Sequence, residues 1–73
     1  MAERKINRLK VVLAEKDLTN KWLAEKLGYT EGMISRWASN VKQPPLTVLY
    51  DISLLLKIDI KDLVESNGHL FKK

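Results

Sequence analysis

The stretch from Asn20 to Ser39, NKWLAEKLGYTEGMISRWAS, constrains the fold more than any other part of the chain. Apolar residues recur at helical spacing on both sides of Gly28. A glycine at this point suits the left-handed residue that follows the end of a helix. Thr30 is expected to cap the next helix, because its hydroxyl oxygen can accept a hydrogen bond from a backbone N–H. The stretch therefore predicts two short helices joined by a tight turn.

The order of side chains in this stretch is typical of a helix-turn-helix. Ala24 is small enough to let the two helices cross closely, and Ile34 and Trp37 lie three residues apart on the inner side of the second helix. An ordinary pair of antiparallel helices is the alternative. It does not require this succession of a small residue, a glycine, a β-branched residue and an aromatic residue, so we favour the helix-turn-helix.

Composition limits the classes of protein to which the chain can belong. Its 73 residues, 45% of them hydrophobic, predict one small domain, and the absence of cysteine excludes disulfides and thiolate metal sites. No apolar run approaches the ~18 residues of a membrane span, and the first residues lack the apolar core of a signal peptide. A reducing cytoplasm is the expected setting, without a membrane partner.

The distribution of charge favours a polyanionic partner. The net charge is +4 and the sequence pI is about 9.5. Residues 1–10 carry +3, residues 19–43 carry +2, and residues 51–65 carry −2. The first half of the chain is therefore the basic half, and it contains the predicted helix-turn-helix. This layout is expected of a protein that faces DNA with its helix-turn-helix. We find no nucleophile with its base, no phosphate-binding loop and no metal-ligand cluster, and we expect no enzymatic activity, no cofactor and no catalytic or metal-binding residue.

Periodicity predicts an all-α domain of five short helices in one compact bundle. The expected helices span residues 6–16, 20–28, 31–38, 45–56 and 60–65. The domain is expected to cover residues 1–73, with a core from 6 to 65 and flexible tails at 1–5 and 66–73. Thr19 and Asp59 are expected N-caps, and Asn40 is expected to take the left-handed conformation after the third helix.

Apolar positions in these helices predict which residues form the core. The first helix should bury Ile6, Leu9, Val12 and Leu13, and the fourth should bury Leu46, Leu49, Ile52 and Leu56, with Val48 and Leu55 widening its stripe. Between them, Leu23, Leu27, Ile34 and Trp37 should complete the core from the helix-turn-helix.

Three blocks of sequence agree in order and spacing with one known family. They are LAEKLG with ISRW, Pro44 with the leucine-rich stretch after it, and LKID followed by LV. Through them, residues 6–64 resemble the Cro/C1-type (XRE, phage-repressor-like) helix-turn-helix domain. The resemblance implies a lambda-repressor-like fold of five helices that binds DNA, usually as a dimer and usually as a transcriptional regulator.

The chain departs from that family at several positions. Asp17 stands where glycine is common. Leu13 and Ala38 stand where many members keep a partly buried Arg–Glu pair. Replacing both charges together is coherent, because an apolar pair packs without leaving one buried charge unpaired. Glu31 and Gly32 occupy positions where phage repressors often have glutamines that read bases, which puts the target sequence in question.

The resemblance implies that the beginning of the third helix enters the major groove. It nominates six base-contacting residues: Thr30, Glu31, Gly32, Met33, Ser35 and Arg36. Arg36 is the strongest candidate, since a guanidinium can bind guanine O6 and N7 together. A phosphate contact or a solvated arginine is the alternative. Glu31 could accept a hydrogen bond from cytosine N4, or only interact favourably with the helix N-terminus.

Two further groups of residues are candidates for contacts with the DNA backbone. Asn20 and Lys21 open the second helix, where backbone amides and partial positive charge favour a phosphate. Asn40, Lys42 and Gln43 follow the third helix and would run along the backbone there.

Two functions from different classes fit these observations. The first is a sequence-specific transcriptional regulator of bacterial or phage origin, repressor-like or Cro-like, which binds double-stranded DNA as a homodimer and lies with the nucleoid in the cytoplasm. Its dimer is expected to use apolar residues near the C-terminus: Ile58, Ile60, Val64, Leu70 and Phe71. The second is a protein-interaction or antitoxin-type module with the same fold, an unidentified protein partner and little base reading, which Glu31 and Gly32 favour.

Overall fold

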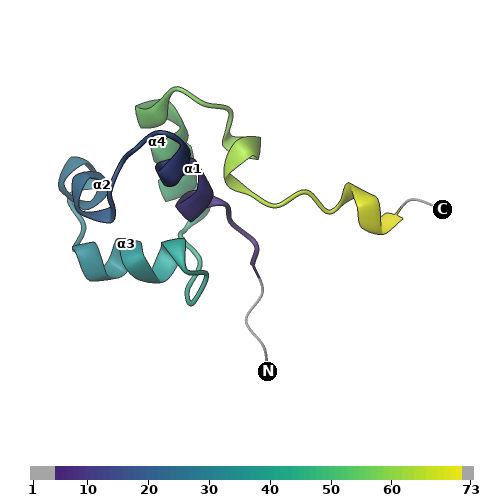
Figure 1. Cartoon of the computed structure of the whole chain (residues 1–73), viewed down its shortest axis with the longest axis horizontal. Helices are drawn as coiled ribbons and strands as arrows, with labels where there is room; N and C mark the ends of the chain where they lie inside the picture. The colour runs from purple at the N-terminus through teal and green to yellow at the C-terminus, as the bar shows by residue number, and fades with distance from the viewer. Residues whose placement is uncertain (1–4, 72–73) are drawn as a thin grey trace.

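A computed structural model describes residues 5–71 and confirms an all-α domain. Its helices, in chain order, are α1 (Leu9–Glu15), α2 (Asn20–Leu27), α3 (Glu31–Ala38) and α4 (Leu46–Leu56), followed by two 3-10 turns, η1 (Ile60–Leu63) and η2 (Gly68–Phe71). Figure 1 shows α2 and α3 side by side at one end of the molecule, and the chain beyond η1 running away from the helices. The predicted tail positions 1–4, 72 and 73 lie outside the described residues.

The core lies where the four helices and η1 meet. Each of these five elements contributes one fully buried side chain to it: Leu9, Leu23, Ile34, Ile52 and Leu63. Burying such a side chain stabilises the fold by about 1.5–3 kcal/mol. Most of the predicted core residues are confirmed, including Trp37 at 3% exposure. None of the described helices is long and apolar enough to cross a membrane.

The predicted N-caps are confirmed. Thr19 Oγ1 accepts from the backbone N–H of Trp22 at 3.0 Å, and Thr30 Oγ1 accepts from that of Met33 at 3.1 Å. Asp59 caps η1 in the same way, by accepting from Lys61 N–H at 3.0 Å. Each cap satisfies a donor that the first turn of a helix leaves without an intrahelical partner.

Each of the four helices is followed within two residues by a residue with left-handed backbone conformation. Gly28 (φ 78°) and Asn40 (φ 63°) adopt it as predicted, and Asp17 (φ 57°) and Lys57 (φ 58°) adopt it as well. In each case the N–H of the following residue bonds to a carbonyl five positions earlier, as Leu18 does to Leu13 at 2.9 Å. This bond is the mark of the Schellman motif, which turns the chain sharply out of the helix.

The expected fifth helix is wrong, because the structure has four α-helices in the described residues and a single 3-10 turn in its place. Asp62 N–H bonds to Asp59 O at 2.9 Å, a three-residue spacing, and Val64 N–H closes on Lys61 O at 3.4 Å. Val64 is then extended (φ −126°, ψ 151°). Only Leu63 of this segment enters the core fully.

The first helix begins at Leu9 rather than at residue 6. The segment before it is extended and pairs with the chain after η1 through an antiparallel bridge between Asn7 and Val64. Arg8 N–H donates to Leu63 O at 2.8 Å, and Glu65 N–H donates to Ile6 O at 2.7 Å. Ile6 is consequently 49% exposed, and its predicted place in the buried stripe is wrong.

The fourth helix buries four of its six predicted core residues, and two of the six are exposed. Its inner face consists of Val48, Leu49, Ile52, Ser53 and Leu56. Leu46, the first residue of the helix, is 73% exposed, and Leu55 is also exposed. Ser53 was not expected inside. Its hydroxyl is satisfied because it donates to Tyr50 O at 2.6 Å, one turn earlier.

Candidate nucleic-acid interface

The α2–α3 pair is held in a fixed geometry by its turn and its inner side chains. Gly28 and Tyr29 both donate their N–H groups to Ala24 O, at 2.9 and 3.0 Å. Tyr29 lies edge-on against Trp37, with ring centroids 5.1 Å apart and an interplanar angle of 72°. With Ala24 and Ile34 buried between the helices, this is the compact helix-turn-helix that the sequence predicts.

Four of the six predicted base-contacting residues share one solvent-exposed face of α3. They are Glu31, Gly32, Ser35 and Arg36. Their spacing places them on one side of the helix, opposite Ile34, Trp37 and Ala38, which are buried. Side chains on the exposed face carry a carboxylate, a hydroxyl and a guanidinium, which together can donate and accept hydrogen bonds at base edges.

Thr30 and Met33 are placed differently from the other four candidates. Thr30 is exposed, but its hydroxyl oxygen already accepts the capping hydrogen bond of α3. Met33 is half-buried and packs against the hydrophobic core. Gly32 faces open space, because a Cβ at this position would have no atom within 4 Å. Packing within this chain therefore does not explain why residue 32 is a glycine.

The backbone-contact candidates divide into two groups. Asn20 is half-buried and Lys21 is exposed, both in the first turn of α2, and Lys42 is exposed just beyond α3. In the sequence, Asn20 and Lys21 precede α3 and Lys42 follows it.

Asn40 and Gln43 form the second group, and their side chains make hydrogen bonds within the domain, where the sequence predicts phosphate contacts. Asn40 is 8% exposed. Its Oδ1 accepts from the N–H groups of Ile6 at 2.8 Å and Asn7 at 3.0 Å, and from Gln43 Nε2 at 3.0 Å. Gln43 Oε1 in turn accepts from Asn7 Nδ2 at 2.7 Å. Both amide side chains are thus committed to hydrogen bonds within the domain.

Asn7 is the residue that sequence reasoning missed. It is 3% exposed, its Oδ1 accepts from Leu9 N–H at 3.1 Å, and its Nδ2 donates to Trp37 O at 2.9 Å. Asparagine often accepts a hydrogen bond from the backbone N–H two residues on, although Arg8 holds the N-cap position of α1. That signal could have indicated a turn just before α1, but not the contact with α3.

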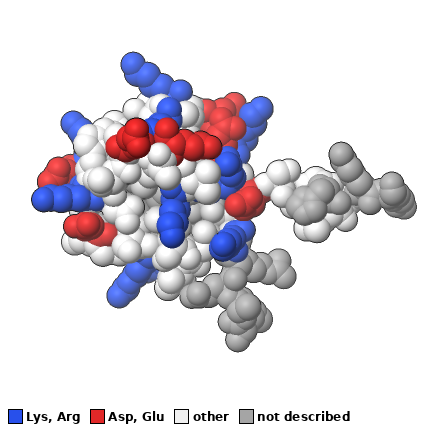
Figure 2. All heavy atoms as spheres, in the orientation of Figure 1, with Lys and Arg blue, Asp and Glu red and all other residues white. Residues whose placement is uncertain are grey.

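Positive charge is not gathered into one field on the face that Figure 2 views. Basic and acidic side chains are interspersed there. The charge segregation along the sequence thus does not become a single basic surface on this side.

Comparison with known proteins agrees with this geometry. A family model described as the Cro/C1-type helix-turn-helix DNA-binding domain matches residues 8–68. A crystal structure of a proposed DNA-binding protein from Bacteroides fragilis is 52% identical, with a TM-score of 0.80, over 82% of this chain and 97% of that chain. A comparison with curated proteins gives no match. The chain belongs to the family of Cro/C1-type helix-turn-helix DNA-binding domains.

Proposed function

We propose that this domain is a sequence-specific transcriptional regulator that inserts α3 into the major groove of DNA. One observation carries the proposal: Glu31, Gly32, Ser35 and Arg36 share the exposed face of α3 while the opposite face is locked into the core. A helix presented in this way can lie in the groove with its polar face against base edges. No chemical step is involved, since regulation follows from occupying an operator.

Each residue of the face has a distinct role in this proposal. Arg36 binds guanine through two hydrogen bonds, and Glu31 accepts from cytosine N4. Gly32 lets the helix backbone approach the DNA closely, because nothing projects from it. Thr30 and Met33 contribute less, since one caps α3 and the other is half-buried. Asn20, Lys21 and Lys42 hold phosphates on either side of the groove.

The domain acts as a homodimer in this proposal. Of the apolar residues expected to form the dimer, Ile58 and Ile60 pack against the monomer's own core. Val64, Leu70 and Phe71 are 36%, 69% and 73% exposed, so they remain for a second copy. A symmetric pair would place two α3 helices about 34 Å apart, matching half-sites one turn of DNA apart. Such a protein acts at an operator as small bacterial or phage regulators do, either by blocking transcription or by recruitment.

The test is selection of bound fragments from a pool of random duplexes, followed by titration of the enriched and scrambled duplexes at several salt concentrations. We expect an enriched motif with two related half-sites and a specificity ratio of about 10³ or more over scrambled DNA. Enrichment of no motif, with equal binding of both duplexes, would refute sequence-specific regulation.

A protein-interaction or antitoxin-type module is the second candidate, and one further observation favours it. Leu46, Tyr50 and Leu54 recur every four residues along α4 and are 73%, 55% and 61% exposed. An apolar stripe of this kind can mark a protein interface. If this candidate holds, the selection above yields no motif.

A further inference from the structure

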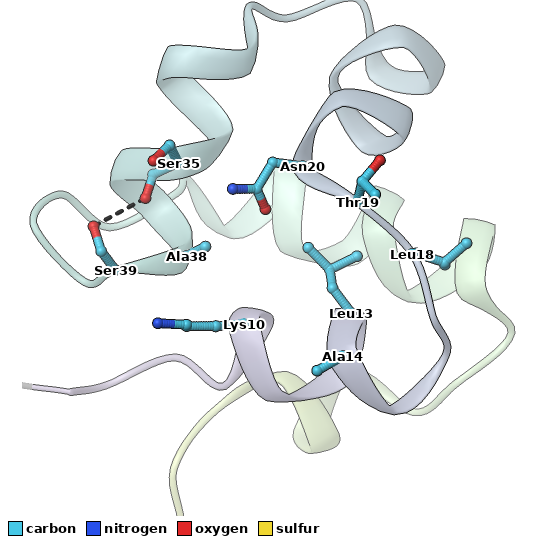
Figure 3. Close-up of a pocket in the computed structure, with 9 residues that line it drawn as sticks. All are labelled: Lys10, Leu13, Ala14, Leu18, Thr19, Asn20, Ser35, Ala38 and Ser39. Carbon is cyan, nitrogen blue, oxygen red and sulfur yellow. Dashed lines mark hydrogen bonds between the residues drawn. The ribbon is translucent and has the colours of Figure 1, made fainter.

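A crevice of about 340 Å³ opens where α1, the beginning of α2 and the end of α3 meet. Figure 3 shows the side chains that line it. Leu13 and Ala38 are buried at 3% and 6% exposure, and Leu18 is half-buried beside them. These three residues give the crevice an apolar lining at its inner side.

The residue types at positions 13 and 38 explain why the space is open. In this chain Leu13 packs into the core and Ala38 carries only a methyl group. The crevice is therefore a consequence of this chain's own sequence.

Polar side chains from three elements surround the opening of the crevice. Lys10 comes from α1, Asn20 from α2, and Ser35 and Ser39 from α3 and the residue after it. In Figure 3, the side chains of Lys10 and Asn20 extend to the side on which Ser35 and Ser39 lie. Among the described residues that line the crevice, Lys10 alone is charged and there is no carboxylate. The opening thus favours an anion.

We infer that Lys10 binds a phosphate of the DNA backbone at the opening of this crevice, and so brings α1 into the DNA interface. The inference rests on the proposed function, because it places Ser35 at the groove and Asn20 at the backbone. Lys10 lies at the same opening as both. A lysine ammonium is a compact charge with three rotatable donors on a flexible stem, which suits a phosphate whose orientation is set by other contacts. Lys10 is exposed, so its side chain can contact a phosphate without a change in the packing of the core.

The test compares Lys10→Ala with Lys16→Ala by fluorescence-anisotropy titration against the selected and scrambled duplexes at several salt concentrations. Lys16 is also exposed but lines a different hollow of the surface with Glu15 and Ile58, so it is the matched control for the loss of one charge. Lys10→Ala should reduce the slope of log K against log salt by about one unit on both duplexes. Lys16→Ala should leave the slope unchanged, and Lys10→Arg should restore it. Melting temperatures should be the same for all four proteins.

Three other results are possible, and each is decisive. Equal slopes for Lys10→Ala, Lys16→Ala and the parent would overturn the contact while leaving the proposed function intact. A parent protein that binds neither duplex at any salt concentration would refute the proposed function itself.

The third result concerns a free anion. Inorganic phosphate is titrated while the amide resonances of Asn20, Ser35 and Ser39 are followed by NMR. Saturable shifts that Lys10→Ala abolishes, without any effect on duplex binding, would assign the crevice to a small phosphate in place of DNA.

Discussion

Asn7 and Asn40 hold each other by reciprocal hydrogen bonds, although 33 residues separate them. Asn7 N–H donates to Asn40 Oδ1 at 3.0 Å, and Asn40 Nδ2 donates to Asn7 O at 3.2 Å. Asn7 also bonds to Trp37 O, in the last turn of α3. The segment before α1 is thereby fastened to the end of the helix that we propose reads DNA. Because these groups are buried, each lost partner would leave a donor or acceptor unsatisfied.

Replacing Asn40 with Gly and with Ala separates the two roles of this residue. Asn40→Gly keeps the left-handed backbone (φ 63°) but removes the acceptor of Ile6 and Asn7 N–H. We expect a loss of about 1–3 kcal/mol in the free energy of unfolding. Asn40→Ala should lose roughly 1 kcal/mol more, because a Cβ is disfavoured at positive φ. Urea unfolding measures both. Equal stability of Asn40→Gly and the parent would show that the network contributes nothing.

Much of the fold could be predicted from the sequence because its signals are local. The caps at Thr19, Thr30 and Asp59 depend on a hydroxyl or carboxylate near its own helix. Helical periodicity places Leu23 and Ile34 in the core without knowledge of any partner. The left-handed ends at Gly28 and Asn40 follow from residue type.

The remaining features depend on contacts between distant parts of the chain. Residues 6–8 have helical periodicity, but Arg8 N–H pairs with Leu63 O and Ile6 O pairs with Glu65 N–H. The position of Asn40 after α3 favours a contact with DNA, and only the position of Asn7 in space shows why the Asn40 amide faces inward. Leucine at helical spacing is usually buried, so the sequence predicts Leu46 in the core. The orientation of α4 over its neighbours decides otherwise.

Ile34→Ala tests the core of the helix-turn-helix. Ile34 is fully buried, so the substitution removes apolar contacts and leaves a cavity. The expected loss is roughly 2–5 kcal/mol in the free energy of unfolding, comparable with the whole stability of a small domain. Val41→Ala, at a position 55% exposed, is the matched control and should change stability by less than about 0.5 kcal/mol. Similar melting temperatures for the two variants would contradict the assignment of Ile34 to the core.

Lys57→Gly is expected to stabilise the domain. Lys57 ends α4 in the left-handed region (φ 58°), where a residue with a Cβ is strained and glycine is not. Removing this strain should raise the free energy of unfolding by about 1 kcal/mol. The greater flexibility of glycine in the unfolded chain offsets part of that gain. Thermal unfolding followed by circular dichroism measures the change. Lys61→Gly, in η1, is the control, because that substitution relieves no positive φ and should not stabilise.

Phe71→Ser tests the proposed dimer. Phe71 is 73% exposed and its ring has no place in the monomer's core, so the substitution should leave the monomer's thermal stability unchanged. The dimer should become weaker, since burial of an aromatic side chain supplies much of the stabilisation of an interface. Sedimentation velocity over a range of concentrations gives the dissociation constant. Val41→Ser is the control at an exposed apolar residue outside both proposed protein interfaces. A parent protein that stays monomeric at high concentration and binds single half-sites would argue against the dimer.

Arg36→Ala and Lys42→Ala should weaken DNA binding in two different ways, because the residues lie on different parts of the proposed interface. Arg36 is on the exposed face of α3, whereas Lys42 follows the helix. Loss of a base-reading arginine should cost about 1–3 kcal/mol at the selected site and remove preference at one base pair. Loss of a phosphate-binding lysine should weaken all duplexes equally and reduce the salt slope by about one unit.

The measurement is an anisotropy titration of both variants against the selected duplex, a scrambled duplex and single-base-pair variants of the selected site. Lys57→Ala is the control for charge alone, since Lys57 ends α4 and has no part in the proposed interface. If Arg36→Ala weakens selected and scrambled DNA by the same factor, then Arg36 contacts a phosphate. Specificity would then have to come from Glu31 and Ser35 on the same face, or from the shape of the DNA, which a protein reads through the energy of deforming it.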